Sequence, residues 1–199
     1  MNTLILASAS PRRAELLRRI GISFSAVPSP YRECFDRRPP LEQTQRLARG
    51  KVDALLEARS DLHRHTILGA DTSIDIDGRI LGKPANREEA AELLRILSGR
   101  RHEVITALSL YNGATGSIES ATETTTISVA PLDSREIDWY LDTVEWRDAA
   151  GGYRIQGRGA IFVRRIEGCY FNVMGLPLRL FYGMLISAGW ELYRDIPYR

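Results

Sequence analysis

Cysteine is scarce in this sequence of 199 residues, and the two cysteines that occur are far apart. Cys34 and Cys169 belong to no Cys-x-x-Cys pair, which argues against both a zinc site and a disulfide scaffold. His63 and His65 likewise have no carboxylate or cysteine at metal-ligand spacing. The sequence therefore predicts free thiols and a surface loop around these two histidines.

Long apolar runs are also absent. No stretch of about 20 apolar residues occurs, and residues 1–6 lead into a strand-like segment instead of a basic and then apolar signal peptide. We therefore expect a cytoplasmic protein without a membrane partner. The net charge of +2 is small for a protein that wraps duplex nucleic acid, so we expect no stable nucleic-acid partner.

Three common nucleotide and hydrolase motifs are missing. Gly82-Lys83-Pro84 lacks the spacing and the hydroxyl residue of a Walker loop, and Gly157-Arg158-Gly159 lacks the third glycine of a dinucleotide fingerprint. No serine lies in a Gly-x-Ser-x-Gly elbow. These absences exclude a Walker site, a Rossmann site and an α/β-hydrolase nucleophile.

The apolar periodicity predicts a mixed α/β protein, because strand patterns and helical patterns are interspersed along the chain. No internal repeat is visible, so we expect residues 1–199 to form a single domain. Ser10, Asn86 and Asp133 are expected helix N-caps, and Asp77-Gly78 is an expected hairpin turn. The expected strands cover 3–7, 22–27, 66–70, 74–76, 80–81, 102–111, 122–129 and 161–166, and the expected helices run from 11 to 21, 41 to 57, 86 to 99, 133 to 144 and 177 to about 189.

Two segments carry residues suited to phosphate chemistry. Ser8-Ala9-Ser10-Pro11-Arg12-Arg13 falls between a strand and a helix start. Such a start attracts anions and disfavours cations, so Arg12 and Arg13 suggest a bound polyphosphate; two solvated arginines are the alternative. Asp71 directly follows the apolar run 66–70, where a carboxylate at a strand end can accept a proton from water or hold a metal. A turn or cap role for Asp71 is the alternative.

The chain has only two lysines, Lys51 and Lys83. Either could reach a phosphate as a point charge, although lysines on helix surfaces are usually only solvated.

Seven separated blocks, in order along nearly the whole chain, resemble the Maf family. Besides Ser8-Ala9-Ser10-Pro11-Arg12-Arg13, they are Gly69-Ala70-Asp71-Thr72, Leu81-Gly82-Lys83-Pro84, Leu97-Ser98-Gly99 with His102 and Thr106, Ile155-Gln156-Gly157, Ile166-Glu167-Gly168 and Val173-Met174-Gly175-Leu176-Pro177. The resemblance implies a nucleoside triphosphate pyrophosphatase with a curved mixed sheet, flanking helices, and two lobes around a cleft. It also implies a divalent metal, Mg or Mn, with ligands unknown, and by analogy a homodimer.

The resemblance further implies roles for individual residues. Asp71 matches the proton acceptor of the family, and Glu33 and Lys51 match positions that line its cleft. Arg12, Thr72 and Gln156 stand where members that prefer dTTP and UTP carry these residues, whereas the 7-methyl-GTP branch resembles Ser-Pro-Trp, Asp-Gln and Glu there. Cleavage between the α and β phosphates needs a base and cations on the departing pyrophosphate, which Asp71 and the set Arg12, Arg13, Lys51 and Lys83 can supply.

Two other functions stay open at this point. One is a pyrophosphatase for 7-methyl-GTP or another modified nucleotide. The other is a regulatory binding protein of septum formation, from which the family takes its name. The chain also departs from the family pattern, because Ala149 replaces a usual lysine and Arg154 stands where a glycine is common. Our hypothesis is that Arg154 replaces part of the lost charge, or that the substrate preference is altered.

Overall fold

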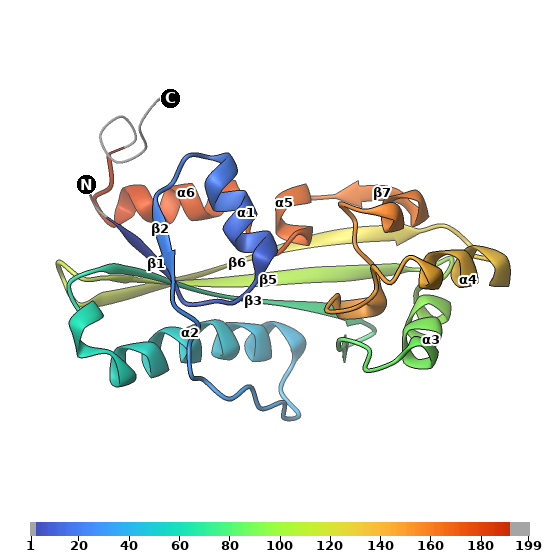
Figure 1. Cartoon of the computed structure of the whole chain (residues 1–199), viewed down its shortest axis with the longest axis horizontal. Coiled ribbons are helices and arrows are strands. Elements are labelled where there is room, and N and C mark those ends of the chain that lie inside the picture. Colours follow the sequence, from blue (N-terminus) through green and yellow to red (C-terminus); the bar gives the residue numbers. More distant parts are fainter. Residues whose placement is uncertain (1–2, 192–199) are drawn as a thin grey trace.

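A computed structural model describes residues 3–191 of the chain, and one mixed sheet runs along the length of the molecule (Figure 1). Its seven strands are arranged in the order β2-β1-β3-β5-β6-β7, with β4 paired to β3 off this path. β1 is parallel to β2 and β3, and the other pairs are antiparallel. The strands are β1 (Leu4–Leu6), β2 (Phe24–Ala26), β3 (Thr66–Ile76), β4 (Arg79–Leu81), β5 (Arg101–Asn112), β6 (Ser117–Val129) and β7 (Val163–Glu167).

Helices cover both faces of this sheet, which confirms the predicted mixed α/β class. In Figure 1, α2 lies under the sheet and α1 and α6 lie above it, while α3 and α4 lie near the opposite end. α1, α2 and α6 belong to one lobe, and α3 and α4 belong to the other. Both lobes share the one sheet. The helices are α1 (Pro11–Arg19), α2 (Pro40–Ala58), α3 (Arg87–Leu97), α4 (Ser134–Asp142), α5 (Tyr170–Val173) and α6 (Leu178–Ser187), with 3-10 turns η1 (Ser60–Leu62), η2 (Ala150–Gly152) and η3 (Arg158–Phe162). No helix within residues 3–191 is long and apolar enough to cross a bilayer.

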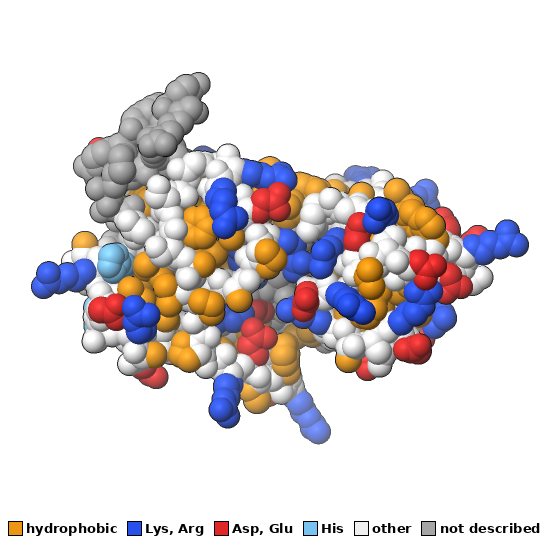
Figure 2. Space-filling model, viewed as in Figure 1, with side chains coloured by type: hydrophobic (Ala, Val, Ile, Leu, Met, Phe, Trp, Pro, Cys, Tyr) orange, Lys and Arg blue, Asp and Glu red, His pale blue; other side chains and the backbone are white. Residues whose placement is uncertain are grey.

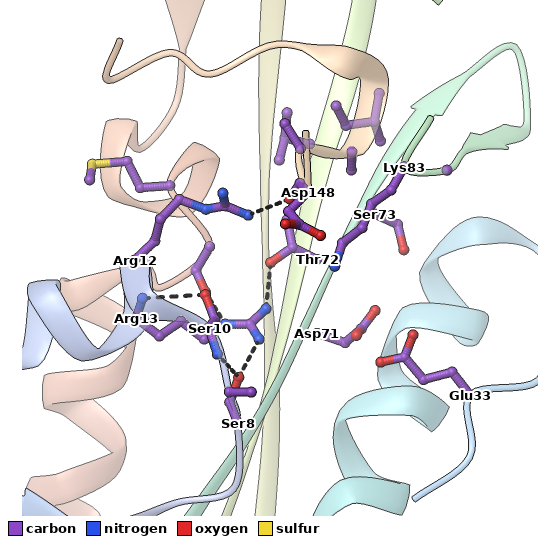
Figure 3. A pocket seen from close by; sticks show the side chains of 18 of the residues that line it. Ser8, Ser10, Arg12, Arg13, Glu33, Asp71, Thr72, Ser73, Lys83 and Asp148 are labelled. Carbon is purple, nitrogen blue, oxygen red and sulfur yellow. Dashed lines mark hydrogen bonds between the residues drawn. The ribbon is translucent and has the colours of Figure 1, made fainter. Parts of the chain in front are cut away.

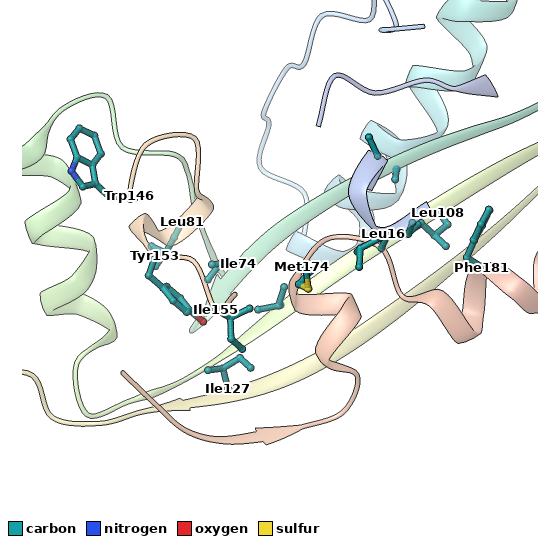
Figure 4. Close-up of a cluster of buried hydrophobic side chains, with 14 of the residues drawn as sticks. Leu16, Ile74, Leu81, Leu108, Ile127, Trp146, Tyr153, Ile155, Met174 and Phe181 are labelled. Carbon is teal, nitrogen blue, oxygen red and sulfur yellow. The ribbon is translucent and has the colours of Figure 1, made fainter. Parts of the chain in front are cut away.

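Two hydrophobic cores form on opposite faces of the sheet, because neighbouring side chains of a strand alternate between the faces. Ile67 of β3 belongs to the smaller core, with Val52 and Leu55 of α2. Leu68 of β3 belongs to the larger core, together with Leu16 of α1. Figure 4 shows that this larger core continues from α1 and α6 to the region of α3, so it joins the two lobes.

The expected local signals are present in the structure. Ser10 Oγ accepts a hydrogen bond from the backbone N–H of Arg13 at 3.5 Å and caps α1. Asp133 forms a capping box with Glu136 at the start of α4. Asp77 has a φ of 54°, as the two-residue hairpin between β3 and β4 requires.

The predicted end of the central strand is wrong. We expected a strand over 66–70 that stops before Asp71, but β3 continues to Ile76, and Asp71 lies near its middle. The reason is that β5 pairs with β3 over residues 67–75 without a break. The expected strand over 161–166 also begins later, at Val163, because the residues before it form η3.

Candidate active site

The sheet is interrupted on one side of β3. β1 pairs with β3 only over Thr66–Leu68, and β4 pairs with it only over Ile74–Ile76. Within residues 3–191, no strand covers 69–73 on that side. A cavity of about 890 Å³ lies at this notch, a volume typical of small-molecule sites. Figure 2 shows charged side chains of both signs around a hollow near the middle of this face.

Asp71 and Thr72 reach the cavity from opposite faces of the sheet, because consecutive strand side chains alternate. Asp71 lies on the α2 side, where Lys51 Nζ is 2.6 Å from Asp71 Oδ1. Thr72 lies on the α1 side, where Arg13 Nη2 donates to Thr72 Oγ1 at 3.0 Å. Since the notch is open to both faces, one ligand can contact both residues.

A shared ammonium group holds two carboxylates on the α2 side. Besides Asp71, Lys51 Nζ contacts Glu33 Oε1 at 2.7 Å. Burial by itself raises the pKa of Glu33, but the hydrogen bond and charge of Lys51, with the charges of Lys83 and Arg13, lower the pKa below its usual value. Glu33 is therefore ionised at neutral pH, and negative charge faces the cavity on this side.

A buried guanidinium group stands on the α1 side. Arg13 is only 8% exposed, and it donates from Nε to the Gly175 carbonyl at 2.8 Å and from Nη1 to Ser8 Oγ at 3.1 Å. Burial lowers the pKa of Arg13, whereas the charges of Asp71 and Glu33 oppose this shift, so acid and base lie close enough to interact. An arginine stays protonated in proteins, and each Nη atom keeps a second hydrogen for a ligand.

All predicted site residues line this one cavity, although they come from distant parts of the chain. Figure 3 shows Arg12 and Arg13 on one side of it and Asp71 and Glu33 on the other. The predicted residues are Asp71, Arg12, Thr72, Gln156, Arg13, Lys51 and Lys83. Lys83 and Gln156 are exposed on the cavity wall, whereas Lys51 is largely buried.

Comparisons with known proteins identify the family of the chain. The family profile described as Maf-like protein matches residues 3–188. The chain belongs to the Maf family. It is 44% identical to a dTTP/UTP pyrophosphatase of Symbiobacterium thermophilum, with 97% of each chain covered. It is 45% identical to a dTTP/UTP pyrophosphatase of Bacillus velezensis, covering 88% of this chain and 90% of the relative. A solved HAM1 protein from Coxiella burnetii is 17% identical, with a TM-score of 0.44, over 66% of this chain and 75% of that one.

Two glycines of the Maf blocks explain how the helices approach the site. A Cβ at Gly69 would lie 2.5 Å from the Ala48 carbonyl oxygen, so only glycine lets α2 pack this closely against β3 and bring Lys51 to Asp71. Gly175 has a φ of 98°, which favours glycine, and its carbonyl accepts the hydrogen bond from Arg13.

The sequence did not reveal the polar network behind Thr72. Thr72 Oγ1 lies 3.0 Å from Thr106 Oγ1, and Thr106 donates to the Asn172 carbonyl at 3.0 Å. Asn172 in turn donates from Nδ2 to the Val104 carbonyl at 2.8 Å. Thr106 could have been suspected from its place in a Maf block, but no pattern in the sequence indicated Asn172.

His102, a residue of one of the Maf blocks, lies behind the cavity wall. It is only 2% exposed, and its Nε2 lies 2.9 Å from the hydroxyl oxygen of Tyr153, which lines the cavity. His102 therefore supports the cavity wall from behind.

The side chains at the notch could hold a divalent metal only together with substrate. Within residues 3–191, no group of three or more histidine, cysteine, aspartate or glutamate side chains is placed to bind a metal ion. Asp71 and Glu33 offer two carboxylates that share one cation, Lys51. Mg²⁺ in nucleotide sites is usually bound by one or two carboxylates plus substrate phosphates, so this donor set fits a cation bridged by the substrate.

Proposed function

We propose that this chain hydrolyses dTTP and UTP to the nucleoside monophosphate and pyrophosphate. The observation that carries the proposal is the position of Asp71, which faces a cavity lined by Arg12, Arg13, Lys51 and Lys83 from separate segments. A carboxylate among cations suits a reaction that activates water and expels a polyanion. The relatives at 44% and 45% identity are dTTP/UTP pyrophosphatases, which supports the same substrates for this chain.

The reaction follows from what each residue can do. Asp71 accepts a proton from a water molecule whose oxygen attacks the α-phosphorus. The bond from the α-phosphorus to the bridging oxygen breaks, and pyrophosphate departs with the bonding electron pair. Lys51 holds the Asp71 carboxylate in place through the 2.6 Å contact. Arg13 and Lys83 stabilise the charge that develops on the departing pyrophosphate.

A divalent cation, Mg or Mn, is part of the proposal. Asp71 and Glu33 would hold it together with phosphate oxygens, and it would supply positive charge that polarises the phosphoryl group. Arg12, Thr72 and Gln156, the positions that differ between the Maf branches, all line the cavity. We assign the preference for pyrimidine nucleotides to Thr72 and Gln156, and we assign Arg12 to the phosphates.

A panel of nucleotides with detection of pyrophosphate, run with and without a chelator, tests the proposed function. We expect fastest release from dTTP and UTP, and loss of activity when the chelator is present. Fastest release from 7-methyl-GTP would instead identify the modified-nucleotide branch. Tight nucleotide binding without pyrophosphate release would favour a regulatory binding protein. The homodimer and the cytoplasmic location stay predictions for measurements of mass in solution and of location in the cell.

A further inference from the structure

Two arginines from distant segments meet at adjacent carbonyl groups on the cavity wall. Arg12 of α1 donates from Nη2 to the Asp148 carbonyl at 3.2 Å, and Arg154 donates from Nη2 to the Arg147 carbonyl at 2.6 Å. Both arginines line the cavity. Because the two acceptors are consecutive in the chain, the two guanidinium groups lie near each other.

Among the described residues, only the charge of Asp148 partly offsets the positive charge of this pair. Within residues 3–191, neither Arg12 nor Arg154 forms an ion pair with an aspartate or glutamate. Arg154 Nε is buried and has no hydrogen-bond partner. Burial lowers the pKa of Arg12, the charge of Arg154 lowers it further, and Asp148 opposes this only in part. Two partly buried like charges are unfavourable unless an anion joins them.

Hydrogen bonds fix the backbone around Arg154 and the Asp148 turn. Asp148 has a φ of 57°, and the backbone N–H of Gly151 donates to the Gly82 carbonyl at 3.0 Å, which ties this turn to the segment that carries Lys83. The backbone N–H of Arg154 donates to the Tyr140 hydroxyl at 3.0 Å. The guanidinium pair is therefore held ready for a ligand instead of being ordered by it. Ala149 lies on the same wall and carries no charge, so Arg154 supplies the cation there.

We propose that Arg12 and Arg154 jointly bind the phosphate oxygens of the nucleotide, which makes Arg154 a further substrate-binding residue of this chain. A neutral base carbonyl would leave the two cations uncompensated, whereas a phosphate group would neutralise them. This inference rests on the proposed function, since it takes the nucleotide as the ligand of the cavity.

Calorimetric titration of the whole chain with inorganic pyrophosphate, and separately with uridine, tests the inference without turnover. The variants are Arg154→Gln, Arg12→Gln and a control, Arg165→Gln, which removes the same charge from an exposed arginine on β7 outside the cavity. We expect both cavity variants to weaken pyrophosphate binding by about 10-fold or more, as loss of a charge-assisted hydrogen bond does, with the control unchanged. Arg154→Lys keeps the charge but not the fork of donors, and we expect an intermediate Kd.

Other outcomes would overturn the inference. One is an Arg154→Gln variant that unfolds at the wild-type Tm and binds pyrophosphate as tightly as wild type. Another is a loss confined to uridine binding, which would place Arg154 at the nucleoside end. Because the titration does not depend on hydrolysis, a loss of pyrophosphate binding in a chain without pyrophosphatase activity would support the anion site while rejecting the proposed function.

Discussion

Lys51 Nζ lies 2.6 Å from Asp71 Oδ1, and the two side chains are only 12% and 11% exposed. The ammonium group therefore shields the carboxylate from Glu33, which contacts the same nitrogen. The hydrogen bond and the charge of Lys51 also lower the pKa of Glu33.

Replacement of the proposed base should abolish turnover while leaving the fold intact. Asp71→Asn keeps the size of the side chain but cannot accept the proton from water, so we expect kcat to fall by about two decades or more. Steady-state kinetics with UTP and circular dichroism of the same sample measure the two effects. Asp142→Asn, at an exposed ion pair with Arg87, is the matched control. Wild-type kcat in Asp71→Asn would move the base to another residue.

Removal of the shared ammonium should destabilise the protein at neutral pH. Lys51→Met leaves the Asp71 and Glu33 carboxylates without their common cation, and breaking a largely buried pair costs about 3 kcal/mol of unfolding free energy. The native pKa of Glu33 is lowered, so its contribution is present above the unfolded pKa and is lost as the pH falls through the native pKa. The difference in unfolding free energy between variant and wild type should therefore become smaller in acid.

Urea unfolding at several pH values measures this difference. Arg49→Met on the same helix removes an exposed pair with Asp53, and we expect it to cost less than about 1 kcal/mol. If Lys51→Met and Arg49→Met lose the same unfolding free energy relative to wild type, or if the loss in Lys51→Met does not change with pH, Lys51 acts through packing alone.

The five longer helices, the caps and the residues that line the cavity could be predicted, whereas the short helix α5 and the geometry of the site could not. Ser10 and Asp133 act as caps because capping depends on neighbours in the chain. The notch is different, since it exists because β1 pairs with β3 only as far as Leu68, a long-range register that no local pattern encodes. The same register places Asp71 and Thr72 on opposite faces inside a continuous strand, whereas the sequence suggested an acid at a strand end.

Other residues at the site could not be predicted, because their roles depend on contacts between distant segments of the chain. Asn172 and Tyr153 had no local signal, because their roles depend on partners 68 and 51 residues away, Val104 and His102. Arg154 was visible only as a departure from a family pattern, and its nearness to Arg12 depends on the turn around Asp148.

The contact between α2 and β3 should tolerate no side chain at position 69. Gly69→Ala would place a Cβ 2.5 Å from the Ala48 carbonyl oxygen and 2.6 Å from Val52 Cγ2, so the helix must move away from the strand. Overpacking of this kind costs about 1 to 3 kcal/mol. The shift would also lengthen the contact between Lys51 and Asp71, so we expect kcat to fall along with Tm.

Gly183→Ala is the control for this substitution. It lies in α6, where a Cβ would meet no atom within 4 Å, and alanine there should raise stability by up to about 1 kcal/mol. An unchanged kcat and Tm in Gly69→Ala would mean that α2 and β3 can separate without affecting the site.

The buried histidine behind the cavity should make the protein less stable in mild acid. Burial lowers the pKa of His102 to about 4, so the native state keeps it neutral where the unfolded chain already binds a proton. The unfolded state therefore binds more protons between about pH 6.5 and 4, and stability falls as the pH falls through that window. The shift in the pKa of His102 corresponds to a loss of about 3 kcal/mol of unfolding free energy, and this full loss is reached only below the native pKa.

His102→Gln removes this proton uptake while keeping a polar group opposite the Tyr153 hydroxyl. We expect the variant to be less stable than wild type at pH 7, because the packing against Tyr153 is disturbed, but to lose less stability between pH 6.5 and 4. Thermal and urea unfolding across that range measure the difference in slope, with His63→Gln, an exposed histidine outside the cavity, as the control. If His102→Gln loses stability in acid as steeply as wild type, the carboxylates alone cause the acid sensitivity, because only a group that gains a proton on unfolding can contribute to that slope.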